Sequence, residues 1–280
     1  MPELLLPFQL PFMQTAFAIA VAVAIPMALL SCFLVLRGWA LMGDAISHAV
    51  LPGVVLAYAA GLPIAVGAFV AGFACAAGTG WLKDNSRIKE DTAMGVVFSG
   101  LFGLGLVLYA SLPTTLHLSH LLFGDMLGVV WADVAWSAAA GGVVVVAILA
   151  FRADFAAQIF DPTHARAIGL PVRALHYGLL ALVALAVVGA LQAVGIILAI
   201  ALLITPGATA LLWARRLGPM LAVATVLSVG AAVLGVYASF WVDAAPAPTV
   251  VLTLTLAFVA SLLLARRGER RARMAPVKRP

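Results

Sequence analysis

Two ionisable residues, Asp44 and His48, lie one helical turn apart inside the stretch GDAISHAVLPG, which begins at Gly43. Their spacing puts both side chains on one face of a helix. A charged carboxylate in the middle of a membrane span costs about 3 kcal/mol on insertion scales, so it normally faces a partner or a polar pathway. An oxygen donor beside a nitrogen donor suits a divalent transition metal. We interpret the pair as a transit site for such an ion. Alternatively, the two side chains satisfy each other or a neighbouring helix and only hold the bundle together.

Two prolines lie inside apolar runs and mark candidate gates or kinks. Pro52 has no N–H, so the carbonyl of His48 loses its helical partner and the helix is expected to kink there. A carbonyl freed near the middle of a membrane is tolerated where it lines a cavity or finds another partner. Pro206, in the run LLITPGATALL, is expected to break or kink its span in the same way. For Pro206, kinked packing is as good an explanation as a gate.

The remaining polar residues suggest one further candidate site. His117, His120 and Asp125 lie together in a segment between two spans and are candidates for a metal-attracting outer mouth. The alternative is that these surface side chains have no special role. His176, near the opposite membrane face, is expected to be solvated.

The composition defines the class of protein. Of 280 residues, 65% are hydrophobic and only 10% are charged, whereas soluble domains carry about 25% charged residues. The chain is therefore expected to be all-α, a polytopic bundle of transmembrane helices. Both cysteines lie in apolar runs, which favours buried free thiols over a disulfide framework.

Apolar runs of about 20 residues predict about nine spans, with eight to ten as the range. They are 14–36, 39–60, 62–82, 92–111, 133–151, 174–193, 195–213, 217–240 and 247–265. All 16 Lys and Arg residues then fall on one side, which the positive-inside rule makes cytoplasmic. The N-terminus is thus expected outside and the C-terminus in the cytoplasm. The basic residues are assigned to topology and lipid contact, not to nucleic acid.

This topology divides the chain into a single membrane domain, 1–265, and a basic cytoplasmic tail, 266–280, that is expected to be disordered. Residues 112–132 are too apolar for a simple loop, and counting them as a span would split the basic residues between two faces. We expect them to form a re-entrant or interfacial segment on the outer side.

The longest cytoplasmic connection, 151–173, predicts a short amphipathic helix at about 155–170. Asp161 is its candidate N-cap, Pro162 its first helical residue, and Gly169 its end. Such a helix is either a coupling element or a helix that rests on lipid. The chain has no G-x-x-x-x-G-K-[ST] motif, so it is not expected to hydrolyse ATP. It also has no Ser/His/Asp or Cys/His arrangement with recognisable spacing, so it is not expected to be an enzyme of another kind.

Four segments together resemble the membrane permease subunit of ABC importers for zinc, manganese or iron. They are LRGWALMGDAISHAVLPGVVLAY at 36–58, FDPTHARAIGLPV at 160–172, VGIILAIALLITPGATALL at 194–212 and LLFGDMLGV at 121–129. The resemblance implies a homodimer in the bacterial inner membrane, two separate ATPase subunits on its cytoplasmic face and an extracytoplasmic metal-binding protein. It implies that Asp44 and His48 contact the metal in transit, and that no cofactor is permanently bound.

The same resemblance makes 160–172 the helix that docks on the ATPase. Its candidate coupling residues are Asp161, Pro162, His164, Ala165 and Gly169. Three rival functions remain open: a proton-coupled secondary transporter of a cation, a structural scaffold, and an ABC permease for a metal chelate. The sequence does not choose among zinc, manganese and iron, because an Asp/His set is compatible with each.

Overall fold

The computed structural model describes residues 5–112 and 124–274, and within these ranges the chain is helical with no strand. The helices are α1 (Leu6–Gln9), α2 (Pro11–Arg37), α3 (Met42–Ala49), α4 (Leu51–Ala59), α5 (Ile64–Asp84), α6 (Glu90–Ser111), α8 (Trp131–Ala150), α9 (Arg152–Phe160), α10 (Pro162–Ala167), α11 (Val172–Trp213), α12 (Leu217–Val242) and α13 (Pro246–Met274).

Nine segments of the described chain are long and apolar enough to cross a membrane. The helices α3 and α4 together make one of them, Met42–Ala59, and α11 holds two, Val172–Leu191 and Ala193–Trp213. The prediction of a nine-span all-α bundle is confirmed. The connection between α6 and α8 adds no further span within its described residues, and Gly124–Val130 form a turn before α8.

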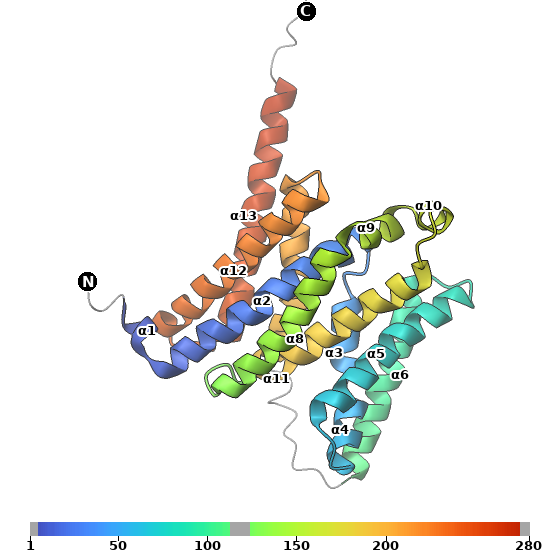
Figure 1. Cartoon of the computed structure of the whole chain (residues 1–280). Coiled ribbons are helices and arrows are strands. Elements are labelled where there is room, and N and C mark those ends of the chain that lie inside the picture. The colour runs from blue at the N-terminus through green and yellow to red at the C-terminus, as the bar shows by residue number, and fades with distance from the viewer. Residues whose placement is uncertain (1–4, 113–123, 275–280) are drawn as a thin grey trace, which may run out of the picture.

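The most buried span is α2, which packs against α8, α11 and α12 in the middle of the bundle (Figure 1). On one side of it, α4, α5 and α6 pack on one another, while α13 packs on α11 and α12 and leads away to the C-terminus (Figure 1). Residues 266–274, for which disorder was expected, belong to α13. Residues 275–280 lie outside the described range.

Small residues allow the helices next to the Asp44–His48 pair to meet backbone to backbone. A Cβ atom on Gly53 in α4 would lie 2.0 Å from the carbonyl oxygen of Gly67 in α5. A Cβ atom on Gly105 in α6 would lie 2.9 Å from the ring of Pro52. Since real Cβ atoms do not approach other atoms this closely, only glycine fits at these crossings, as is common between membrane helices.

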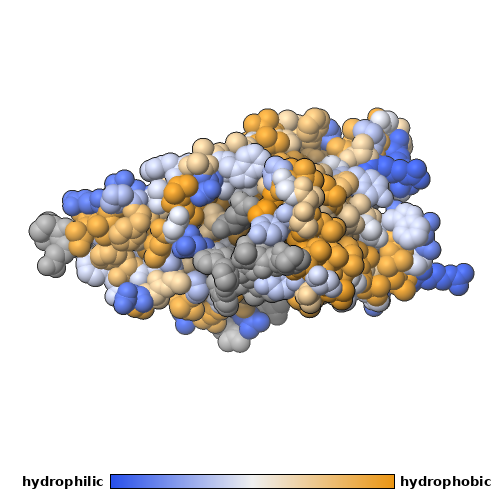
Figure 2. Space-filling model, turned by 90° about the horizontal axis from the view of Figure 1, so that it is seen from below, coloured by the Kyte–Doolittle hydropathy of each residue, from blue (hydrophilic) through white to orange (hydrophobic). Residues whose placement is uncertain are grey.

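Large apolar side chains remain uncovered on several spans. Val107 of α6, Val146 of α8 and Leu256 of α13 are each more than 60% exposed. Figure 2 shows hydrophobic side chains over broad areas of one face of the molecule. Lipid or another protein chain must cover these surfaces, because the spans cross a hydrocarbon layer.

Candidate functional site

The side chains of Asp44 and His48 are in contact on α3. His48 Nδ1 lies 3.2 Å from Asp44 Oδ1 and 3.0 Å from the Asp44 carbonyl oxygen. The other side of α3 is buried, through Ile46, Ser47 and Ala49 among others. By contrast, 40% of the Asp44 side chain and 25% of the His48 side chain remain exposed. The pair therefore lies on the open face of α3 and not in the interior of the chain.

Two phenylalanines of α6 hold the imidazole of His48. The ring centroids of Phe98 and Phe102 lie 5.7 and 5.6 Å from the imidazole centroid, both in edge-to-face geometry. Neither phenylalanine was singled out from the sequence. Their i, i+4 spacing on a neighbouring span was the only available signal, and it is common in apolar helices.

The contacts of Nδ1 determine what the other ring nitrogen can do. Both neighbours of Nδ1 are acceptors, so these contacts favour the tautomer that carries its hydrogen on Nδ1 and donates a hydrogen bond to Asp44. In the neutral imidazole, Nε2 then keeps a lone pair, which is the form that binds metals. A metal-bound histidine commonly donates its second N–H to a carbonyl or carboxylate in this way. The arrangement therefore suits a metal ligand.

One chain supplies only part of a coordination shell. Among residues 5–112 and 124–274, no group of three or more His, Cys, Asp and Glu side chains is placed to hold a metal ion. Asp44 and His48 supply one carboxylate and one imidazole, whereas protein metal sites commonly need four ligands. Any further His, Cys, Asp or Glu ligand for an ion at this pair must come from outside the described part of the chain.

The helix carrying the pair is interrupted just beyond it. Its α3 part ends at Ala49 and α4 begins at Leu51, with Val50 between them, two residues before Pro52. Pro206, in contrast, lies within α11, and the non-helical residue of α11 is Gly195, with φ +76°. Helical geometry therefore continues through Pro206, and α11 departs from it at Gly195, where glycine permits a positive φ.

The proposed outer mouth is only partly described. His117 and His120 lie outside the described residues. Asp125 is exposed, and its carboxylate accepts a hydrogen bond from the Gly128 N–H at 3.0 Å, which stabilises the local turn. Next to it, Gly124 packs against the interruption of α11, where an added Cβ would lie 2.4 Å from Gly195 N. The structure therefore gives Asp125 a local structural role and does not bring it to Asp44 and His48.

The expected single helix at about 155–170 is two helices, α9 and α10. The chain leaves helical geometry at Asp161, with φ −146° and ψ 86°, and starts again at Pro162. The Asp161 carboxylate accepts hydrogen bonds from the N–H groups of Thr163 and His164, at 3.1 and 2.9 Å. It therefore caps α10, as a carboxylate at this position does, and the cap separates the two helices.

One side of the capped helix α10 is open to its surroundings. On α10, Ala165 is fully buried, whereas its neighbour His164 is exposed. Gly169, with φ +85°, closes the end of α10. Phe160 and Ile168 are 67% and 57% exposed, so two apolar side chains flank α10.

His176, which was expected to be solvated, is half-buried against the rings of Trp39 and Tyr177.

Comparisons with known proteins show the family to which the chain belongs. The model of the ABC 3 transport family matches residues 9–265. The chain is 53% identical to the chelated iron transport system membrane protein YfeD of Yersinia pestis, over 92% of this chain and 86% of the relative. It is 44% identical to the manganese transport system membrane protein MntB of Synechocystis, over 92% of this chain and 84% of the relative.

Solved structures share the fold. A chain of PsaBC from Streptococcus pneumoniae, in complex with a Fab, superposes with a TM-score of 0.83 at 38% identity, covering 93% of this chain and 94% of that one. An inward-facing metal-chelate type ABC transporter gives a TM-score of 0.70 at 16% identity, which shows the fold alone. The chain is thus a multi-pass protein of the bacterial inner membrane, and it belongs to the ABC 3 transport family.

Proposed function

We propose that this chain is the permease subunit of an ABC importer that moves a divalent transition metal ion across the inner membrane. The observation that carries the proposal is the Asp44–His48 pair, held on the open face of α3 within a membrane span. Nε2 of His48 and the carboxylate of Asp44 are the groups that would bind the ion. Because Nε2 lies on the side of the ring away from Asp44, the two groups of one chain would reach the same ion only after the Nδ1 contact opens. A site of few ligands suits transit, because an ion that is bound too tightly does not leave.

The names of the relatives support a metal as cargo. Relatives at 42–53% identity are named for iron or manganese transport, one of them for chelated iron. The Asp44–His48 pair favours the bare ion, because a carboxylate and an imidazole bind metal directly, whereas a chelate already fills the coordination shell of its metal.

We further propose that two copies of this chain form the pathway. The pair lies at the surface of one chain, and a second copy related by two-fold symmetry would supply a second Asp44 and a second His48. The four side chains would then provide the number of ligands that a metal site commonly needs. The same packing would cover part of the open face of α3 and α6.

The energy would come from two ATPase subunits docked at the end of the bundle where α9 and α10 lie. By the positive-inside rule this end is cytoplasmic, which puts the N-terminus outside. Phe160 and Ile168, exposed on either side of α10, provide apolar docking positions. An extracytoplasmic metal-binding protein would deliver the ion to the opposite end.

Metal accumulation in cells that lack other importers of the metal tests the proposal. Uptake should require both this chain and its ATPase partner, and it should stop when the ATP-binding lysine of the partner is replaced. Uptake that survives this replacement but collapses when the proton gradient is dissipated would overturn the proposal in favour of a proton-coupled secondary transporter.

A further inference from the structure

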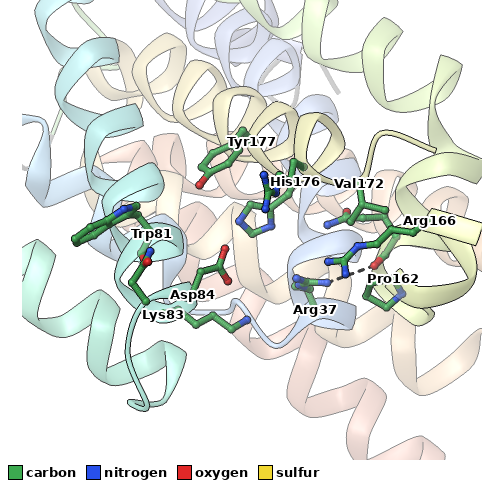
Figure 3. A pocket seen from close by; sticks show the side chains of 12 residues that line it. Arg37, Trp81, Lys83, Asp84, Pro162, Arg166, Val172, His176 and Tyr177 are labelled. Carbon is green, nitrogen blue, oxygen red and sulfur yellow. Dashed lines mark hydrogen bonds between the residues drawn. The ribbon is translucent and has the colours of Figure 1, made fainter. Parts of the chain in front are cut away.

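A second polar feature lies at the basic end of the bundle, away from the Asp44–His48 pair. A pocket of about 640 Å³ opens between the end of α2, the end of α5, the helices α9 and α10, and the start of α11 (Figure 3). This volume is within the range of small-ligand pockets. Four basic residues from four parts of the chain line it: Arg37, Lys83, Arg166 and Arg173.

The pocket carries an uncompensated positive charge. Within the described chain, Lys83 is paired with Glu90 at 2.5 Å, and no ion pair forms at Arg37, Arg166 or Arg173. The only carboxylate that lines the pocket is Asp84. Three unpaired guanidinium groups against one carboxylate leave an excess of two positive charges. Like charges gathered in one concave site repel one another and attract an anion.

The backbone adds to this positive potential. Val172, Arg173 and His176, in the first two turns of α11, line the pocket. No side chain caps this helix end, since Pro171 at the N-cap makes no side-chain hydrogen bond. The N-terminus of a long helix carries partial positive charge and free N–H groups, which favour phosphate.

Arg37 is oriented by groups that leave its charge unneutralised. Its guanidinium donates a hydrogen bond to the main-chain carbonyl of Gln158 at 3.5 Å and lies 5.1 Å from the centroid of the Trp39 ring. Gln158 is itself one of the residues that line the pocket, is 2% exposed, and leaves its side-chain Oε1 without a hydrogen-bond partner in the described structure. A ligand that carries both an anionic group and a hydroxyl would satisfy both residues.

The position of the pocket indicates the source of that ligand. Arg37 and Asp84 are the last residues of their spans, and Val172 is the first residue of another, so the pocket lies at the depth of lipid headgroups. Trp81, which is 62% exposed, lines its edge. Tryptophan is enriched at this depth because its ring is apolar while its N–H is polar.

We propose that this pocket binds the phosphodiester headgroup of an anionic, hydroxyl-bearing phospholipid such as phosphatidylglycerol in the adjacent leaflet. The guanidinium groups bind the phosphate, and Gln158 accepts a hydrogen bond from the headgroup hydroxyl. Residues at the ends of spans and residues of α9 and α10 line the same pocket. A bound lipid would therefore contact both and hold the ATPase-docking helices against the membrane surface. The proposal does not depend on the metal site.

Native mass spectrometry of the intact importer, permease with its ATPase subunits, tests this proposal. Phosphatidylglycerol is titrated against the wild type, against Arg166→Gln/Arg173→Gln and against the control Arg215→Gln/Arg216→Gln. The control removes the same charge from exposed residues outside the pocket. Each single substitution is measured too, in case the double variant assembles poorly.

The affinity of the pocket variant for the most tightly bound phosphatidylglycerol molecule should be at least about tenfold lower than that of the wild type. The affinity of the control variant should lie within about twofold of the wild-type value. Phosphatidylcholine should bind the wild type and both variants alike. An equal loss in both double variants would overturn the proposal. So would competition by soluble glycerol phosphate at the same concentration as the lipid, which would identify a free anion as the ligand. If the pocket variant releases its ATPase subunits while its affinity for phosphatidylglycerol stays unchanged, the pocket instead belongs to the interface with the ATPase, and the proposal is wrong.

Discussion

Nδ1 of His48 lies 3.0 Å from the carbonyl oxygen of Asp44 and 3.2 Å from its carboxylate, so a single residue orients the imidazole through two acceptors. This contact favours the tautomer that leaves a lone pair on Nε2, and the edge-to-face contacts with Phe98 and Phe102 restrict the plane of the ring. Asp44 therefore has two roles in our proposal. It positions the imidazole of its neighbour, and it would offer an oxygen to the ion only after the contact with Nδ1 opens, because Nδ1 and Nε2 lie on opposite sides of the ring.

A shared site predicts two imidazoles on one ion. Pulsed electron paramagnetic resonance of Mn²⁺ bound to the purified importer should show nitrogen coupling from two equivalent histidines. His48→Gln should remove this coupling, whereas His164→Gln, which alters an exposed histidine on α10, should keep it. Coupling from a single nitrogen in the wild type would contradict the two-copy site.

The close contact between α6 and the interruption at Pro52 predicts a strong effect of one added methyl group. In Gly105→Ala the new Cβ would lie 2.9 Å from the Pro52 ring and from Leu51, and overpacking of this kind costs about 1–3 kcal/mol. The thermal midpoint of the purified permease should fall and metal uptake should decrease. Gly103→Ala on the same helix meets no atom within 4 Å and serves as the control. Equal midpoints for the two variants would refute the close contact.

The hydrogen bonds by which Asp161 caps α10 can be tested separately from the charge of its carboxylate. Asp161→Ala removes the acceptor for the Thr163 and His164 N–H groups, and loss of such a cap costs about 1 kcal/mol of helix stability. Metal transported per ATP hydrolysed should fall in Asp161→Ala and stay near the wild-type value in Asp161→Asn, which can still cap. A loss of the same size in both variants would point to the charge of Asp161 and not to the cap.

The spans could be predicted because each consists of a long apolar run bounded by charged or turn-forming residues. The predicted span 62–82 corresponds to Ile64–Asp84, and 92–111 to Glu90–Ser111. The break near Pro52 followed from the missing N–H of proline. The interruption of α11 at Gly195, although it falls at the first residue of the predicted span 195–213, depends on a positive φ that an apolar sequence pattern does not reveal.

Features that depend on contacts between distant segments could not be predicted. The Asp44–His48 pair follows from helical spacing, but Phe98 and Phe102 reach it only because α6 packs on α3. The same holds for the basic pocket, since Arg37 and Arg173 are more than 130 residues apart and meet through tertiary packing. Asp161 was identified as a cap, whereas the separate helix α9 before it was merged with α10. The apolar pattern continues across both helices, and only the backbone angles at Asp161 divide them.

The central claim is that a metal ion passes the Asp44–His48 pair. Its most direct test is ATP-driven accumulation of radioactive manganese in proteoliposomes that contain the permease with its ATPase subunits and the binding protein. Asp44→Ala and Asp44→Asn should each lower accumulation by more than about tenfold while the ATPase subunits stay bound, because a metal ligand is lost. Asp243→Asn, an exposed carboxylate in a left-handed conformation that asparagine tolerates, should transport like the wild type. Accumulation at the wild-type rate by a correctly assembled Asp44→Ala importer would contradict the account.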